Sequence, residues 1–146
     1  MFRTFLLTGA ILSAFISGTA NADLAIISHP EYEGDKLELI NVKRLFLGER
    51  QSFPNGHKAS PIHHAVGSPD RKDFFISVLG MSESSHKRHW KRMTSTGRGS
   101  SPNALNSYEE ILEWVKDTPG SITYINADKV DDSVKVLLVI EDYDNL

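Results

Sequence analysis

The residue pattern with the clearest chemical meaning is Gly67-Ser68-Pro69-Asp70-Arg71, which lies between an apolar segment and a predicted helix. A helix that begins here exposes backbone N–H groups and about half a positive charge, which favours an anion. The Ser68 hydroxyl can donate a hydrogen bond, and the Arg71 guanidinium can hold an oxyanion through two nitrogens. The same residues are also typical of a well-capped helix, so both interpretations stay open.

A second candidate for anion binding is the segment from Thr94 to Ser100, which is rich in small polar residues. Its Thr96-Gly97 step can present successive backbone N–H groups to an anion. The lysine and hydroxyl residue of a nucleotide-binding P-loop are missing, and an ordinary connecting loop is the alternative. His64 precedes Ser68 by four residues. Its imidazole adds positive charge only when protonated, and its reference pKa is about 6.5. We therefore expect an oxyanion site built from Gly67, Ser68, Arg71, His64, Thr96 and Gly97.

The six histidines do not form a recognisable metal motif. His63 and His64 are neighbours on a predicted strand, so their side chains are expected on opposite faces. His86 and His89 could share a helix face, but the lysines and arginines around them repel a cation. A serine-nucleophile motif and paired carboxylates with acid–base spacing are also missing. The sequence predicts a binding protein with no metal, no cofactor and no catalytic residues.

The charge is unevenly distributed along the chain. Residues 86–98 contain five basic side chains and no acid, whereas residues 128–144 are rich in aspartate and glutamate. The basic segment is expected to be one solvated face of a helix, with Trp90 and Met93 on its buried side. It could also dock a polyanion or an acidic partner. Because the formal net charge is −3, a general nucleic-acid-binding protein is not expected.

The first 22 residues have the three parts of an export signal. A single Arg3 precedes an apolar run over residues 5–16, and Ala20-Asn21-Ala22 is a small-x-small cleavage sequence. We expect cleavage after Ala22, which leaves residues 23–146 as one domain. Hydrophobic and charged contents of 40% and 24% are typical of a globular domain. Since no cysteine is present, the domain has neither disulfides nor a lipid attachment site, and we expect it to be periplasmic.

Strand-like and helix-like segments alternate along this domain, which favours an α/β layered fold. Buried strands are predicted over residues 24–28, 61–66, 121–125 and 134–140. Helices are predicted to begin after Ser68, Ser82 and Ser107, each serving as N-cap, and an earlier helix ends at Gly48. The predicted helices cover residues 39–46, 69–79, about 83–93, and 108 to the break at 118–120.

The order of several motifs resembles the phosphate-type substrate-binding proteins of bacterial ABC transporters. The motifs that carry the resemblance are, in chain order, Ala25-Ile26-Ile27-Ser28-His29-Pro30, Val42-Lys43-Arg44-Leu45-Phe46-Leu47-Gly48, Phe53-Pro54-Asn55-Gly56, Gly67-Ser68-Pro69-Asp70-Arg71-Lys72-Asp73-Phe74-Phe75, Val78-Leu79-Gly80, His89-Trp90, Thr96-Gly97-Arg98-Gly99 and Thr118-Pro119-Gly120-Ser121-Ile122-Thr123-Tyr124-Ile125. These motifs cover nearly all of residues 23–146. The resemblance implies a shortened type-II periplasmic-binding-protein-like fold, with a mixed sheet flanked by helices.

The resemblance also implies a function. The expected protein binds phosphate or a related small oxyanion for ABC-type uptake or sensing, with a transporter permease or a periplasmic sensor as its partner. Relatives place arginine where this chain has His64, and glycine and threonine where it has Pro69 and Asp70. Much of the relatives' first lobe is missing from this sequence. The alternative is therefore a non-transport interaction module with a degenerate anion site, which docks a partner through residues 86–92.

Overall fold

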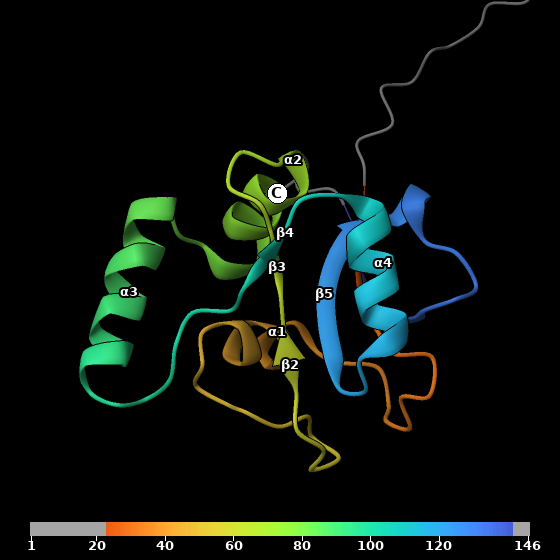
Figure 1. The fold of residues 1–146 in the computed structure, drawn as a ribbon, viewed down its shortest axis with the longest axis horizontal. Coiled ribbons are helices and arrows are strands. Elements are labelled where there is room, and N and C mark those ends of the chain that lie inside the picture. Colours follow the sequence, from red (N-terminus) through yellow and green to blue (C-terminus); the bar gives the residue numbers. More distant parts are fainter. Residues whose placement is uncertain (1–22, 142–146) are drawn as a thin grey trace, which may run out of the picture.

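The computed structural model describes residues 23–141, and its centre is a mixed four-stranded sheet (Figure 1). The strand order is β2-β5-β1-β6, in which β1 is antiparallel to β5 and β6, and β2 is parallel to β5. A separate parallel pair joins β3 to β4. The strands are β1 Leu24–Ser28, β2 Ser60–Pro61, β3 His63–His64, β4 Ala104–Leu105, β5 Ser121–Asn126 and β6 Lys135–Ile140.

Helices lie on both sides of this sheet. They are α1 Leu39–Phe46, α2 Pro69–Phe74, the π-helix η1 Phe75–Leu79 that continues α2, α3 Glu83–Ser95, α4 Tyr108–Asp117 and the short 3₁₀ helix η2 Ala127–Lys129. In Figure 1, α4 stands beside β5, whereas α3 lies at the far end of the molecule from it. The expected shortened α/β fold with a mixed sheet flanked by helices is confirmed.

The central strand β1 is buried on both faces, as its continuous apolar run predicts. Leu24 and Ile26 pack into a core cluster with α1, α2 and η1. Ala25 and Ile27 pack into a second cluster with Ile111 and Val115 of α4. Because side chains alternate along a strand, five residues supply the core on both sides of the sheet.

Three helices begin where the serine N-caps predict. The Oγ atoms of Ser68, Ser82 and Ser107 each accept a hydrogen bond from the backbone N–H three residues later, at 3.4, 3.2 and 3.2 Å. In a capping box, the carboxylate of Glu110 would accept a hydrogen bond from the N–H of the N-cap residue Ser107. In this structure it accepts from the N–H of Asn106 instead. The predicted helix over residues 83–93 is confirmed and continues to Ser95.

The predicted strand over residues 61–66 is wrong in extent. The segment divides into β2 and β3, which belong to different sheets. The N–H of Ile62 still donates to the Ile122 carbonyl of β5, but the N–H of His63 donates to Asn103. The chain thus changes its hydrogen-bonding partner between two consecutive residues, next to a proline that has no N–H to give to a ladder.

Between residues 23 and 141, no helix is both long and apolar enough to cross a bilayer. The expected signal peptide and its cleavage after Ala22 lie outside the described residues.

Candidate functional site

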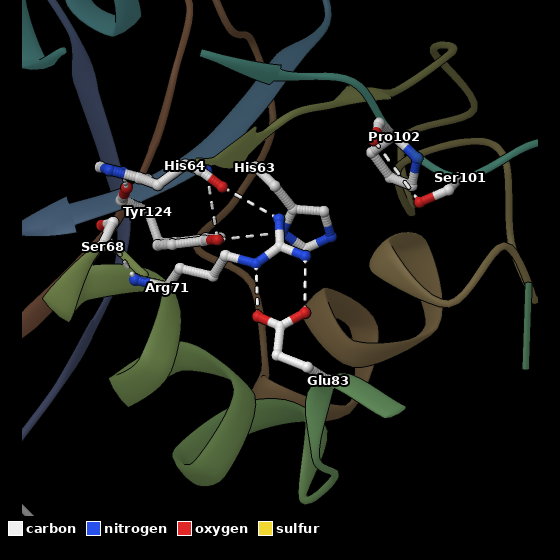
Figure 2. Close-up of polar contacts among 8 residues, drawn as sticks. All are labelled: His63, His64, Ser68, Arg71, Glu83, Ser101, Pro102 and Tyr124. Carbon is white, nitrogen blue, oxygen red and sulfur yellow. Dashed lines mark hydrogen bonds and ion pairs between the residues drawn. The ribbon is translucent and has the colours of Figure 1, made fainter. Parts of the chain in front are cut away.

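Arg71 forms the centre of the predicted anion site, but its guanidinium is already bound within the protein (Figure 2). Nε and Nη2 donate to the two carboxylate oxygens of Glu83 at 2.6 and 2.9 Å, and Nη1 donates to the His64 carbonyl at 3.0 Å. Its charge also lies 4.6 Å above the centre of the Phe75 ring. The fork that the sequence assigns to an oxyanion therefore holds a carboxylate of the same chain.

This ion pair joins a buried cation to a half-exposed anion, since the two side chains are 9% and 47% exposed. The hydrogen bond to Glu83 raises the pKa of Arg71, and the hydrogen bond from Arg71 lowers the pKa of Glu83. Both groups stay ionised near neutral pH. Glu83 is the site residue that sequence reasoning missed, because it follows Arg71 by twelve positions and no local spacing connects them.

The imidazole of His64 lies inside the protein, where β5 already binds it. It is buried, and its Nε2–H donates a short hydrogen bond to the Tyr124 carbonyl of β5. Burial lowers the pKa of His64, although the Tyr124 carbonyl and Asp70 act in the opposite direction. The lowered pKa means that His64 takes up a proton less readily than a free imidazole does.

His63 and His86 belong to the packed interior behind Arg71. The His63 and His86 rings lie 5.3 Å apart, and Nδ1 of His63 shares a 2.9 Å hydrogen bond with the Tyr124 hydroxyl. Burial, followed by the nearby Arg71 charge, lowers the pKa of His63 to about 2 and that of His86 to about 4. Both histidines are aromatic core residues whose imidazoles are neutral near pH 7.

Asp70 fastens the start of α2 to two other elements. Its Oδ2 accepts from the Tyr108 hydroxyl of α4 at 2.8 Å and from the Asn126 N–H at 3.0 Å. Burial and this hydrogen bond raise the pKa of Tyr108 to about 12. A buried carboxylate one residue from the helix start opposes any anion there, and its bonds give it a structural role.

Thr96 and Gly97 do not join the other predicted site residues. They end α3, where the Gly97 N–H donates to the Thr94 carbonyl and the Arg98 N–H donates to the Met93 carbonyl. This is a Schellman C-cap, which needs the positive φ of 70° at Gly97. Glu83 begins α3 and Thr96 follows its last residue, so about 20 Å of helix separates the two positions. A helix C-terminus also carries partial negative charge, which disfavours an anion.

Gly67 and Ser68 are the predicted site residues that remain open to a ligand. Gly67 is exposed, and a side-chain atom added there would meet nothing within 4 Å. The Ser68 hydroxyl accepts the α2 cap bond and keeps its own hydrogen. Proline at position 69 removes one of the N–H groups that a helix start normally offers.

The basic helix α3 presents its charges outward. Trp90 and His86 are buried and Met93 is half-buried, whereas Lys87, Arg88, Lys91 and Arg92 are exposed. His89 donates from Nε2 to the Leu47 carbonyl at 2.8 Å. Among residues 23–141, no three histidine, aspartate or glutamate side chains are grouped to hold a metal ion.

Comparison with solved structures places this architecture beside proteins of phosphate transport. A Clostridium perfringens protein assigned as a phosphate ABC transporter substrate-binding protein, solved with bound phosphate, superposes with a TM-score of 0.63 at 19% identity. An ABC-type phosphate transport receptor from Vibrio cholerae and PstS from Borrelia burgdorferi give 0.62 and 0.59, both at 17% identity.

Each match covers 80% of this chain but only 45–47% of the other protein, so this chain spans slightly less than half of their length. No protein-family model matches the sequence, and no curated protein matches it either. The likeness shows a shared fold.

Proposed function

We propose that this chain is a periplasmic solute-binding protein that binds phosphate or a related small oxyanion for ABC-type uptake or sensing. The observation that carries the proposal is the fold, since 80% of the chain superposes on phosphate-transport proteins, one of them holding phosphate. An exposed Gly67 and a half-buried Ser68 at a helix start, with an arginine one turn further on, are compatible with that function.

Glu83 determines how strongly such a site binds. Its carboxylate occupies the same two guanidinium nitrogens that an oxyanion would use. An incoming phosphate competes with an anion that is tethered at high effective concentration. We therefore expect weak binding in the native protein, and a regulatory role for Glu83, whose movement would release Arg71.

The test is a calorimetric titration of phosphate into the native protein and the variant Glu83→Gln. Removing the carboxylate charge should strengthen phosphate binding about tenfold, because a charge-assisted pair no longer competes. The double variant Glu83→Gln, Arg71→Ala should lose this gain. Glu113→Gln, on the exposed face of α4, is the matched control and should leave affinity unchanged.

Sulfate and a nucleotide are titrated in parallel to define the anion class. If neither the native protein nor Glu83→Gln binds any of these anions saturably at millimolar concentration, the oxyanion proposal fails. Thermal unfolding of each variant shows whether it is folded before the titration is interpreted.

A second candidate function is a non-transport interaction module that docks an acidic partner through α3. The ion pair between Arg71 and Glu83 favours it, since the site arginine is neutralised while Lys87, Arg88, Lys91 and Arg92 remain exposed. In that case polyglutamate should bind in a salt-sensitive manner, and the double variant Lys87→Ala, Lys91→Ala should weaken it. The transport proposal expects no effect of these lysines on phosphate affinity.

A further inference from the structure

A hollow of about 380 Å³ lies on the other side of Trp90 from the ion pair, away from the start of α2. Its walls come from the end of α1, from the segment between α1 and β2, from α3 and from the loop before β4. The lining includes Gly48, Arg50, Gln51, Lys58, Trp90, and residues 98–103. The hollow lies within the size range of small-molecule sites in proteins.

All the charged side chains that line this hollow are positive. Arg50, Lys58 and Arg98 line it, and no acidic side chain does. All three cations are exposed, and none makes an ion pair with another residue of the described chain. They come from three places in the sequence, so their convergence is a product of the fold.

Trp90 lines the hollow with a buried indole ring. It is 7% exposed, and its indole N–H has no hydrogen-bond partner within the described part of the chain. Buried polar groups are normally paired, and this N–H is enclosed by the protein, so the indole ring contributes an apolar wall to the hollow. A side-chain atom at Gly48 would lie 2.6 Å from the Trp90 ring, so only glycine fits there.

A neighbouring hollow of about 390 Å³ shares Trp90, Ser101 and Pro102 with the first one. The Arg71–Glu83 ion pair lines the neighbouring hollow and not the first. Ser101 and Pro102 appear in Figure 2 on a segment separate from the group bonded to Arg71. His86 lines this second hollow, and its Nε2 is also unpaired. Of the two, only the first hollow combines three cations with neutral polar side chains, and it is called the cleft below.

We propose that this cleft binds a phosphomonoester of a sugar. Arg50, Lys58 and Arg98 hold the phosphate group, because guanidinium groups pair with phosphate oxygens through two parallel hydrogen bonds. Gln51, Ser100, Ser101 and Asn103 supply donors and acceptors for the sugar hydroxyls. Inorganic phosphate fills only part of such a volume and leaves these groups unused. Neither Arg71 nor Glu83 lines this cleft, so its cations and its ligand differ from those of the proposed oxyanion site.

The test titrates glucose 6-phosphate, inorganic phosphate and glucose into a Trp114→Phe variant. Trp90 is then the sole tryptophan of the chain and reports on the cleft by its fluorescence. Glucose 6-phosphate should change that fluorescence saturably below millimolar concentration at low salt. Inorganic phosphate should bind at least tenfold more weakly, and glucose should not bind.

Arginine variants locate the ligand. Arg50→Ala and Arg98→Ala should each weaken glucose 6-phosphate binding about ten- to a hundredfold, since each removes a charge-assisted contact. Arg88→Ala removes the same charge from the exposed face of α3 and should have no effect. These three side chains are exposed, so the variants are expected to fold, which circular dichroism checks.

The outcomes separate the two proposals. Absence of saturable glucose 6-phosphate binding, or equal binding by the Arg98→Ala and Arg88→Ala variants, overturns the cleft proposal whatever phosphate does. Phosphate binding that responds to Glu83→Gln but not to Arg98→Ala supports the oxyanion site alone. Equal affinity for inorganic phosphate and glucose 6-phosphate also overturns recognition of a sugar.

Discussion

The start of α2 and the cleft beside Trp90 differ in whether their charges are available. At the start of α2, Arg71, Asp70 and His64 are buried and each is bonded to another part of the protein. In the cleft, Arg50, Lys58 and Arg98 are exposed and unpaired among the described residues. The charges at the strongest sequence motif for anions are satisfied internally. The positive charge of the cleft stays unpaired in the described chain, although only its residues 98–100 belong to a segment that the sequence indicates for anion binding.

This difference shows that a motif predicts the presence of functional groups and not their availability. Glu83 neutralises Arg71 from another helix, and nothing near Arg71 in the sequence indicates it. An anion binds where positive charge is left uncompensated by the fold. If the polar groups around the start of α2 serve stability and not ligand binding, changing them should destabilise the fold. Three predictions test this, from the largest expected effect to the smallest.

Acidification should destabilise the protein through the buried histidines. Because the pKa values of His63 and His86 fall to about 2 and 4 on folding, only the unfolded chain binds their protons near pH 5. Stability is complete above the ordinary value of about 6.5 and is lost as pH falls from there toward the folded pKa. The free energy of unfolding should drop by roughly 3 kcal/mol between pH 7 and pH 5, since solvent screening reduces the share of His86 below that of the deeply buried His63.

Urea unfolding at several pH values measures this loss. A His86→Phe variant keeps an aromatic ring in place and should show more than half of the pH dependence. A native protein with pH-independent stability over this range would mean that these imidazoles are solvated, and that the α2 region is open.

Removing the Asp70 carboxylate should cost less than acidification. Asp70→Ala leaves the Tyr108 hydroxyl and the Asn126 N–H without their shared acceptor, and we expect a loss of about 2–3 kcal/mol in the free energy of unfolding. Tyr108→Phe removes one of these two bonds and should cost about 1 kcal/mol. Equal stability of Asp70→Ala and the native protein would contradict the structural role of Asp70.

Removing the helix cap should have the smallest effect of the three. Ser68→Ala should destabilise the protein by roughly 0.5–2 kcal/mol, whether or not an anion binds nearby. The exposed Lys91→Ala variant is the control and should stay within about 0.5 kcal/mol of the native protein. An unchanged denaturation midpoint for Ser68→Ala would show that its 3.4 Å cap bond contributes nothing.

Much of the fold could be predicted from the sequence because local signals specify it. Serine caps locate the starts of α2, α3 and α4, and the apolar run at residues 24–28 predicts the buried β1. The division of residues 61–66 could not be predicted, since it depends on β5 and Asn103, which lie far along the chain. The π-helical continuation of α2 also has no local signal.

The site was less predictable for the same physical reason. Gly97 has the sequence signature of both an anion nest and a helix C-cap, and only the observed bonds to Thr94 and Met93 decide between them. His64 looks like a titratable ligand until its burial against Tyr124 is known. The residue types show which polar groups the chain has. Contacts between residues far apart in the sequence decide whether those groups bond within the protein or stay available to a ligand.

The position of β1 in the sheet has a consequence for the order of folding. This first strand pairs only with β5 and β6, whose partner residues come roughly a hundred positions later. An N-terminal stretch emerging from the ribosome therefore has no strand to pair with, and the central ladder closes only after residue 140 has been synthesised. Closing such a large loop is slow. The nascent chain should therefore lack its central ladder until residue 140 has left the ribosome, so chaperones have a long interval in which to bind the apolar β1.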